Sequence, residues 1–198
     1  MPFDVSQAVA EVEALLLPPD IETTAYPVLI MMSGLPGSGK SYLSQQLAEQ
    51  LSAVIIESDR VRKALFPQPS YSAQESAIVH RTCQEVMRRL LRKGTRVIFD
   101  ATNLAEFQRE VLYSLAEQGG ARLLIVRTVA PEPVVRERLE QRKAREENAS
   151  DADSRVYRRM SKSEQKIRRG HVCIDTSRDV DEAVRKVLRA VRRCTRGA

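Results

Sequence analysis

Short apolar runs alternate along the chain with segments whose hydrophobic residues recur at helical spacing. Apolar runs predict buried strands at residues 28–32, 54–56, 97–99, 123–126 and 172–174. Helical patterns lie between and after them, at residues 39–51, 72–94, 104–118, from 131 onward and at 179–193. The strands are solid apolar runs, which is typical of a parallel sheet covered on both faces. Alternating strands and helices therefore predict an α/β protein built from crossover units.

Two segments do not follow this alternation. Residues 1–25 contain an apolar helical stretch that ends at Pro18-Pro19, so we predict a helical extension or a partner contact there. Residues 143–163 are polar, rich in both charges and poor in large apolar side chains, and we expect a mobile segment. The length of 198 residues fits one domain, which we place at residues 26–198.

Charge is distributed unevenly along the sequence. The formal net charge is +6, yet residues 1–58 hold seven acidic residues and a single base, Lys40. The other 140 residues hold 31 bases and 19 acidic residues, and 25 of the 32 bases in the chain are Arg. The Arg fork matches phosphate oxygens in two-point contacts. The excess of arginine therefore indicates either a surface that binds phosphate groups or solvated helix faces.

Several classes of protein do not fit the composition. The longest apolar run has eight residues and contains a proline, whereas a bilayer-spanning helix needs about 20. The first residues are acidic and lack the basic region of a secretory signal. Cys83, Cys173 and Cys194 are widely spaced and the chain has two histidines, so neither a disulfide framework nor a zinc site is expected. We expect a cytoplasmic protein with reduced thiols and no membrane partner.

One glycine-rich turn matches the phosphate-binding pattern G-x-x-x-x-G-K-S/T. It follows a predicted strand, precedes a predicted helix, and runs Gly34-Leu35-Pro36-Gly37-Ser38-Gly39-Lys40-Ser41. In this pattern backbone N–H groups surround the phosphates, the lysine reaches the β/γ-phosphates, and the hydroxyl binds Mg²⁺. We predict Lys40 as a catalytic residue, Ser41 as a metal ligand, and the loop through Tyr42 as the nucleotide site. The context disfavours a turn that binds nothing.

Other signatures narrow the class of phosphate-loop protein. The nearest match to the guanine motif N-K-x-D, Asn148-Ala149-Ser150-Asp151, lacks the lysine and follows a charged helix. No transporter-ATPase signature is recognisable, and the chain is short for a ring-forming motor. A small kinase fits these observations better than a GTPase or a motor protein.

Acidic residues follow two further predicted strands. Asp59 and Arg62 come directly after the second strand, and Asp100 ends the third. The carboxyl ends of strands in such sheets face the ligand crevice. Asp59 is therefore placed to accept a proton from an attacking hydroxyl, with Arg62 orienting the acceptor, and Asp100 to hold the Mg²⁺ shell. Asp59 and Asn103 also fit the alternative role of helix caps.

The segments GLPGSGKS, SDRVR and FDATN, with Arg109 six residues after FDATN, together resemble the polynucleotide-kinase-like group of P-loop kinases. This group includes bacterial AAA-type kinases, zeta-toxin-like kinases and antibiotic phosphotransferases. The resemblance covers residues 28–178. It implies a P-loop NTPase three-layer sandwich with a five-stranded parallel sheet and a lid over about residues 143–163.

The resemblance also implies roles for individual residues. Asp59 is the general base, Arg62 an acceptor contact, and Asp100 a metal-shell acid. Asn103 and Arg109 are substrate-binding residues by the same likeness. The segment 175–178 is a candidate contact for the adenine base, although it fits a helix cap equally well.

Kinases of this type close a lid that brings arginines to the transferring phosphoryl group. Arg138 and Arg142 are four residues apart on one helix face, and we predict them as the catalytic pair. Surface salt bridges with acids of the same helix are the alternative. The group Arg155, Arg158 and Arg159 raises the same question.

Residues of the predicted helix at 72–94 and of its flanking loop complete the set of candidates. Ser72 and Glu75 have the spacing of a capping box. His80 and His171 are interpreted as structural. Tyr71 either lines the substrate site or packs within its loop.

The sequence thus predicts a phosphotransferase that uses ATP and Mg²⁺ to phosphorylate a hydroxyl of a small molecule. A polynucleotide 5′-hydroxyl kinase is the alternative, which the excess of basic over acidic residues favours. Aromatic residues make up only 5% of the chain and offer no platform for stacking bases, which favours the small molecule. A nucleotide-dependent switch or binding module that uses the basic residues 178–196 stays open, although the apolar stripe of that helix also fits packing on the sheet.

Overall fold

The computed structural model describes residues 4–18, 20–144 and 154–196. Strands and helices alternate through most of this range. In chain order they are α1 (Val5–Leu16), β1 (Val28–Ser33), α2 (Lys40–Leu51), β2 (Val54–Glu57), α3 (Ser58–Leu65), α4 (Ala73–Arg92), β3 (Val97–Asp100), α5 (Glu106–Gln118), β4 (Arg122–Val129), α6 (Glu132–Ala144), α7 (Ser154–Ser163), β5 (Val172–Asp175) and α8 (Val180–Arg196).

The five strands form one parallel sheet in the order β2-β3-β1-β4-β5. β1 lies in the centre, and all six of its residues are buried. The chain first builds the sheet on one side of β1 and then crosses to the other side. Ligands of open α/β sheets bind beyond the carboxyl ends of the strands at such a point. The predicted fold class, an α/β sandwich with a five-stranded parallel sheet, is confirmed.

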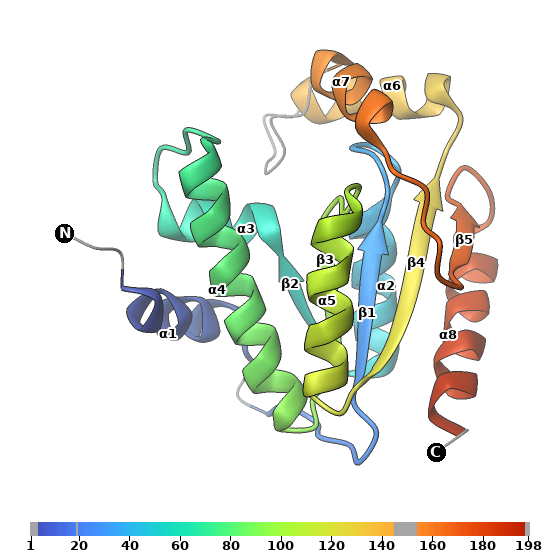
Figure 1. The fold of residues 1–198 in the computed structure, drawn as a ribbon. Coiled ribbons are helices and arrows are strands. Elements are labelled where there is room, and N and C mark those ends of the chain that lie inside the picture. The colour runs from blue at the N-terminus through green and yellow to red at the C-terminus, as the bar shows by residue number, and fades with distance from the viewer. Residues whose placement is uncertain (1–3, 19, 145–153, 197–198) are drawn as a thin grey trace.

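Helices cover both faces of the sheet (Figure 1). Leu29 and Met31 of β1 belong to a core shared with α1, α3, α4 and α5. Val28, Ile30 and Met32 point to the other face, into a core shared with α2 and α8. Alternate side chains of each strand thus fill two separate apolar layers, as the period of a β-strand requires.

Helix α1 is part of the first of these cores. Asp4 caps the helix by accepting hydrogen bonds from the backbone N–H groups of Ser6 and Gln7 at 2.8 and 3.4 Å. Val9 and Val12 are fully buried, and the helix packs against α4 and α3. The apolar stretch predicted within residues 1–25 is therefore a helix packed on the body of the domain.

Helices α6 and α7 lie across the carboxyl end of the sheet (Figure 1). Residues 154–163 of the segment expected to be mobile form the helix α7, while residues 145–153 lie outside the described residues. Within the described residues, none of the helices is both long and apolar enough to cross a bilayer.

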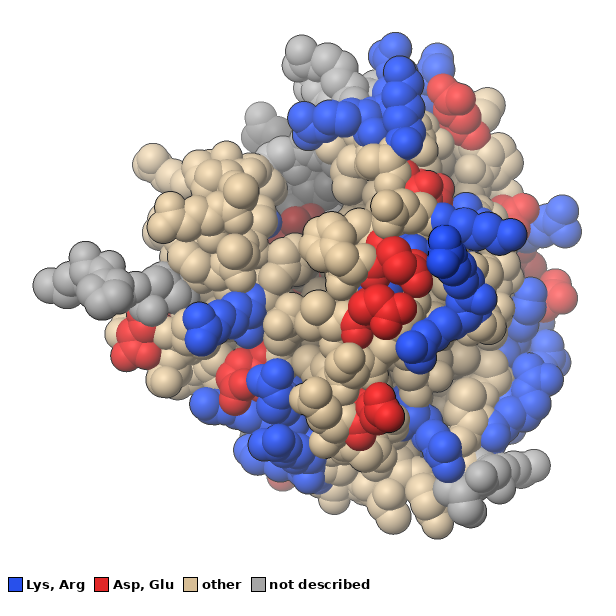
Figure 2. Space-filling model, viewed as in Figure 1, with Lys and Arg blue, Asp and Glu red and all other residues tan. Residues whose placement is uncertain are grey.

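Basic and acidic side chains are interspersed over the face that Figure 2 shows, with basic groups more frequent along its right-hand side. Helix α8 packs the apolar stripe of Val184, Val187 and Val191 into the core. Its exposed positions are basic after Glu182, at Arg185, Lys186, Arg189, Arg192 and Arg193. The packing predicted for this helix is thus confirmed, and its basic residues face solvent.

Candidate active site

The phosphate loop depends on glycines at two tight contacts. Gly34 has a φ of 150°, and a Cβ added to it would lie 2.5 Å from the carbonyl oxygen of Thr128. Gly39 has a φ of 82°, and a Cβ there would lie 2.9 Å from Oγ1 of Thr176. Glycine has no Cβ, so it is the residue that tolerates both a positive φ and so close an approach of a neighbouring oxygen. The loop is therefore held between the end of β4 and the segment after β5.

Hydroxyl groups connect the loop to those neighbours. Ser38 Oγ and Thr128 Oγ1 are 2.7 Å apart, and Thr176 Oγ1 donates to the Ser38 carbonyl at 2.9 Å. Lys40 opens α2 and donates from Nζ to the Leu35 carbonyl at 3.0 Å. The N-cap of α2 is a glycine, so no side chain occupies the positive end of the helix. An anion can take that place, as in other phosphate-binding loops.

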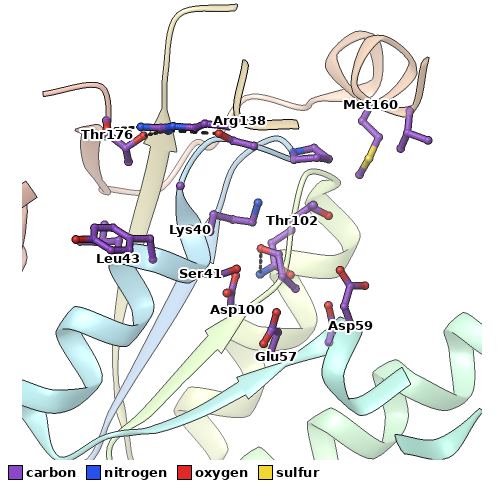
Figure 3. A pocket seen from close by; sticks show the side chains of 18 of the residues that line it. Lys40, Ser41, Leu43, Glu57, Asp59, Asp100, Thr102, Arg138, Met160 and Thr176 are labelled. Carbon is purple, nitrogen blue, oxygen red and sulfur yellow. Dashed lines mark hydrogen bonds between the residues drawn. The ribbon is translucent and has the colours of Figure 1, made fainter. Parts of the chain in front are cut away.

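A cavity of about 880 Å³ lies above the carboxyl ends of the strands. Lys40, Ser41 and Asp100 line its centre, and Figure 3 shows Lys40 extending into it above Ser41 and Asp100. Glu57 and Asp59 lie on the side of β2 in the same view. The structure thus brings the phosphate loop and the predicted acids of two other strand ends to one cavity.

The oxygen ligands at the centre fit a magnesium ion. Ser41 offers a hydroxyl and Asp100 a carboxylate that is 4% exposed, and Mg²⁺ is usually bound through one or two such groups together with substrate phosphates. Within the described residues, no group of three or more His, Cys, Asp and Glu side chains is arranged to hold a metal. In such a site the substrate phosphates and water would supply the remaining ligands of the ion.

Glu57 also lines the cavity and was not among the predicted site residues. It ends β2, and its Cα pairs with that of Asp100 across the two strands. The rule that selected Asp100, an acid at the end of an apolar strand, applies equally to Glu57. The sequence therefore contained the signal for this residue.

Asp59 lies in the first turn of α3 and lines the cavity. Burial raises the pKa of its carboxyl group. The positive charges of Arg62 and Lys40 oppose this effect and the negative charge of Asp100 adds to it, and the net shift of the pKa is upward. A carboxylate with a raised pKa is a stronger base than an ordinary aspartate, which suits proton acceptance.

Arg62 lines the cavity and is 8% exposed. Its Nη1 donates to Glu75 Oε1 at 2.5 Å and its Nη2 to Ser76 Oγ at 3.1 Å. Its guanidinium also lies over the ring of Tyr71, 4.7 Å from the ring centre. The arginine predicted to contact the acceptor is therefore already ion-paired.

Glu75 does not complete the capping box that its spacing predicts. Ser72 Oγ accepts from the backbone N–H of Glu75 at 3.2 Å, which is half of the motif. The Glu75 carboxylate accepts instead from Arg62 and from the N–H and hydroxyl of Ser70 at 2.7 and 2.6 Å. Burial would raise the pKa of Glu75, but these hydrogen bonds outweigh it and lower the pKa to about 2. The Glu75 carboxylate therefore forms an ion pair with Arg62 and does not cap the helix.

Asn103 and Arg109 have different positions relative to the cavity. Asn103 lines it, but its Nδ2 donates to the Met32 carbonyl at 2.7 Å and its φ is 46°, so it joins the loop after β3 to the end of β1. Arg109 is fully buried and is not among the residues that line the cavity. It pairs with Glu106 and donates to the carbonyls of Asn103, Leu104, Gln165 and Lys166. This position does not support the predicted contact between Arg109 and the substrate.

The predicted lid arginines are placed unequally. Arg138 of α6 lines the cavity, and its guanidinium donates to the carbonyl and Oγ1 of Thr176 at 2.7 and 2.9 Å and to the Gly37 carbonyl at 3.4 Å. The side chain of Arg142 lies outside the described residues. Arg159 of α7 is exposed and lines the cavity together with Val156 and Met160.

The two ends of the cavity differ in their lining. The α8 end is formed by Tyr42, Leu43, Thr176, Val180 and Ala183. The α4 end, beside Asp59 and Arg62, includes Val79 and His80 of α4 and Tyr71, whose ring lies against Arg62. His80, interpreted as structural from the sequence, thus faces the cavity. Burial lowers the pKa of its imidazole, and the charge of Arg62 lowers it further.

Comparison with known proteins identifies the family. A family model described as an AAA domain matches residues 29–167, more than half of the chain. The chain belongs to this AAA domain family. Human 6-phosphofructo-2-kinase/fructose-2,6-bisphosphatase 4 is 26% identical over 129 residues, which cover 57% of this chain and 28% of that protein. This chain thus spans little more than a quarter of the length of that relative.

Solved structures of P-loop kinases share the fold. The APS kinase CysC of Mycobacterium tuberculosis, in complex with AMPPNP and APS, superimposes with a TM-score of 0.66 at 19% identity, over 85% of this chain and 99% of that chain. A gluconokinase from Sinorhizobium meliloti gives a TM-score of 0.61 at 22% identity, over 86% and 94% of the two chains. Kti12 of Chaetomium thermophilum, in complex with ADP-AlF3, gives 0.64 at 20% identity, over 82% and 98%. These likenesses confirm the P-loop kinase fold.

Proposed function

We propose that this family member is an ATP-dependent, Mg²⁺-requiring phosphotransferase that moves the γ-phosphoryl group to a hydroxyl of a small molecule. One observation carries the proposal: Lys40 of the phosphate loop and the half-buried carboxyl group of Asp59 line the same cavity. The first group binds a nucleotide phosphate and the second has the raised pKa of a general base. Phosphoryl transfer needs little more than such positioning and charge stabilisation.

The residues divide the reaction between them. Lys40 and the loop N–H groups hold the β- and γ-phosphates, and Ser41 and Asp100 hold the magnesium ion, which neutralises charge on the phosphoryl oxygens when bound. Asp59 accepts the proton of the acceptor hydroxyl. The acceptor oxygen then forms a bond to the γ-phosphorus while the bond from that phosphorus to the bridging oxygen breaks, and ADP leaves.

The α8 end of the cavity suits the base of the nucleotide. Tyr42, Val180 and Ala183 offer apolar surface there, and Thr176 offers backbone and hydroxyl groups. Arg138 connects this end to the phosphate loop through its hydrogen bonds to Thr176 and Gly37. Arg159, on the helix above the cavity, serves the transferring phosphoryl group. Two structures with this fold were solved in complex with AMPPNP and with ADP-AlF3, which supports a nucleotide as a ligand of the fold.

Replacing Lys40 by alanine tests the nucleotide site. Hydrogen bonds to charged groups contribute about 1.5–3 kcal/mol, so Lys40→Ala is expected to weaken binding of AMPPNP–Mg²⁺ by about 10- to 100-fold, measured by isothermal titration calorimetry. Lys93→Ala, at an exposed lysine after α4, is the matched control and should leave binding unchanged. Binding that is equal in wild type and Lys40→Ala would contradict the proposal.

A further inference from the structure

Thr176 lies beside the phosphate loop at a point that the sheet determines. It follows β5 directly, lines the cavity and is 8% exposed. Its backbone N–H donates to the carbonyl of Val129, the last residue of β4, at 2.9 Å. This bond extends the pairing of β4 with β5 by one residue. The backbone of Thr176 is therefore fixed by the sheet, and its side chain projects from a defined position.

The side chain of Thr176 contacts the backbone of two successive loop residues. Its Oγ1 donates to the Ser38 carbonyl at 2.9 Å. A Cβ added to Gly39 would lie 2.9, 3.0 and 3.1 Å from the Oγ1, Cβ and Cγ2 atoms of Thr176. Because a peptide unit is planar and trans, the direction of the Ser38 carbonyl also fixes the direction of the Gly39 N–H. Loops of this kind bind phosphates through such N–H groups.

Arg138 of α6 reaches the same hydroxyl (Figure 3). Its guanidinium donates to Oγ1 of Thr176 at 2.9 Å and to the carbonyl of Thr176 at 2.7 Å. A hydroxyl group has one proton and two lone pairs, so Thr176 accepts from Arg138 and donates to Ser38 at the same time. Hydrogen bonds that follow one another in this way polarise and strengthen each other. The hydroxyl thus connects a charged side chain to the loop backbone.

Helix α6 also packs directly on the loop. A Cβ added to Gly37 would lie 2.9 Å from Cγ1 of Val135 and 3.2 Å from Cγ of Leu139. Both apolar side chains are buried, and Arg138 shares their helix face because residues three and four positions apart are neighbours on a helix. Arg138 also donates to the Gly37 carbonyl at 3.4 Å. The position of α6 and the conformation of the loop therefore depend on each other.

From these contacts we infer that Thr176 is a positioning residue for the nucleotide phosphates. Its hydroxyl orients the peptide unit between Ser38 and Gly39 and couples it to Arg138. The inference rests on the proposed function and extends its phosphate site to a residue that lies 138 positions from Ser38 in the chain. The segment after β5 thereby acts on the phosphates through the loop, in addition to forming the end of the cavity proposed for the base.

Removal and restoration of the hydroxyl test the inference. Thr176→Val is expected to weaken binding of AMPPNP–Mg²⁺ by about 3- to 30-fold in a calorimeter, because a hydrogen-bond network of the loop is lost. Thr176→Ser keeps the hydroxyl and should bind nearly as tightly as the wild type. Thr195→Val is the matched control, because it removes a hydroxyl that donates to the Val191 carbonyl of α8 at 3.2 Å, outside the cavity lining.

Two results of this titration would overturn the inference: equal affinity of the wild type and Thr176→Val, or an equal loss of affinity in Thr176→Val and Thr176→Ser. Thermal unfolding verifies that each variant is folded at the temperature of the titration. If Thr176→Val does not fold, Thr176→Ala and Thr176→Ser provide the same comparison, because alanine and serine differ by the hydroxyl alone.

Magnesium tripolyphosphate separates an effect on the phosphate loop from a contact with the base. This ligand has the three phosphates and no nucleoside. Thr176→Val should weaken its binding by about the same factor as that of AMPPNP, since the hydroxyl acts through the loop. A loss of affinity confined to AMPPNP would mean that Thr176 acts on the base only, and the inference would be wrong.

A double-mutant cycle with Arg138→Ala tests the coupling. The hydrogen bond between Arg138 and Thr176 is lost in either single variant, so the double variant with Thr176→Val should lose less affinity for AMPPNP than the product of the two single effects. A loss equal to that product would show that the two residues act independently and would overturn the coupling. Failure of the wild type to bind AMPPNP would instead contradict the proposed function.

Discussion

In the proposed reaction Asp59 acts as an ionised base, yet its position in the fold disfavours ionisation. It follows the apolar strand β2 directly and begins α3, so the fold holds it at the edge of the cavity where burial raises its pKa. An ionised carboxylate at this position is less well solvated than in the unfolded chain. The protein therefore retains a destabilising group at the place where a base is needed, as functional sites often do.

Asp59→Asn should abolish most of the activity while leaving nucleotide binding intact. General-base catalysis contributes about 10²- to 10⁴-fold, so kcat is expected to fall by that factor. The AMPPNP dissociation constant should change little, because Asp59 does not belong to the phosphate loop. Steady-state kinetics and calorimetry measure the two quantities, with Asp20→Asn, an exposed position, as control. A kcat within a few-fold of wild type would remove Asp59 from the mechanism.

The same substitution has an expected effect on stability that depends on pH. Because the folded-state pKa of Asp59 is raised, the folded protein binds the proton more tightly than the unfolded chain, and stability falls as pH rises from the ordinary pKa to the raised one. At neutral pH the wild type carries the full cost, so Asp59→Asn should have the higher Tm. The difference should narrow as the pH falls toward about 3.9, the ordinary pKa of aspartate. A Tm below that of the wild type at neutral pH would contradict this account.

At the scale of the elements, helices α6 and α7 present arginines to different parts of the cavity. Arg138 of α6 is held at the α8 end by Thr176 and Gly37. Arg159 of α7 has no such hydrogen bonds within the described residues and lies in the wall beside Met160. We therefore expect Arg138 to position the nucleotide and Arg159 to act on the phosphoryl group.

Alanine substitutions should separate these two roles. Arg138→Ala is expected to raise the AMPPNP dissociation constant by about tenfold, because it loses charged hydrogen bonds that contribute roughly 1.5–3 kcal/mol. Arg159→Ala should lower kcat and leave that dissociation constant unchanged. Arg136→Ala, at an exposed residue of α6 that pairs with Glu132 at 3.3 Å, is the control for both. The division of roles is wrong if Arg138→Ala changes only kcat or if Arg159→Ala changes only binding.

At the scale of the whole molecule, the contacts of α1 with α3 and α4 indicate that this helix unfolds together with the rest of the domain. The helix packs on α3, which carries Asp59 and Arg62, and on α4, which carries Glu75 and His80. Arg60 of α3 donates to the Leu15 carbonyl at 3.3 Å, and Glu13 of α1 pairs with Arg89 at 3.6 Å. The contacts connect the N-terminal helix to the elements that form the α4 end of the cavity.

The double substitution Val9→Ala/Val12→Ala should therefore destabilise the whole domain. Removing two buried valine side chains is expected to lower the free energy of unfolding by about 2–5 kcal/mol, and urea unfolding should show one cooperative transition at a lower midpoint. Ala10→Ser, on the exposed face of the same helix, should change stability by less than about 0.5 kcal/mol. An unchanged midpoint, or a separate early transition, would instead mean an independently attached helix.

Much of the site was predictable from the sequence because its signals are local. The phosphate loop is a contiguous run of residues whose backbone conformation its own glycines determine. Asp59 and Asp100 follow short apolar strands, and the geometry of a parallel sheet sends both to the same edge. The same rule, an acid at the end of an apolar strand, would also have selected Glu57. The two apolar layers follow from the alternation of strand and helix, whereas the order of the strands was known only from the structure.

Long-range partners were not predictable in the same way. Arg62 and Glu75 are thirteen residues apart and meet because α3 and α4 pack against each other. Arg109 is enclosed by backbone carbonyls from its own helix start and from residues 165–166, which are distant in the chain. In both cases the arginine's role depends on which acceptor comes within hydrogen-bond distance, and local pattern holds no information about that.

The sequence by itself thus determined the α/β class, the phosphate loop and the acids at the strand ends, since each depends on residues adjacent in the chain or on the repeat of a strand. Only the tertiary structure decided that α1 belongs to the core, that Arg109 is enclosed and that Arg62 is neutralised. The physical reason is that the net charge a side chain presents is a property of its surroundings. Those surroundings are assembled from helices that the sequence separates and the fold brings together.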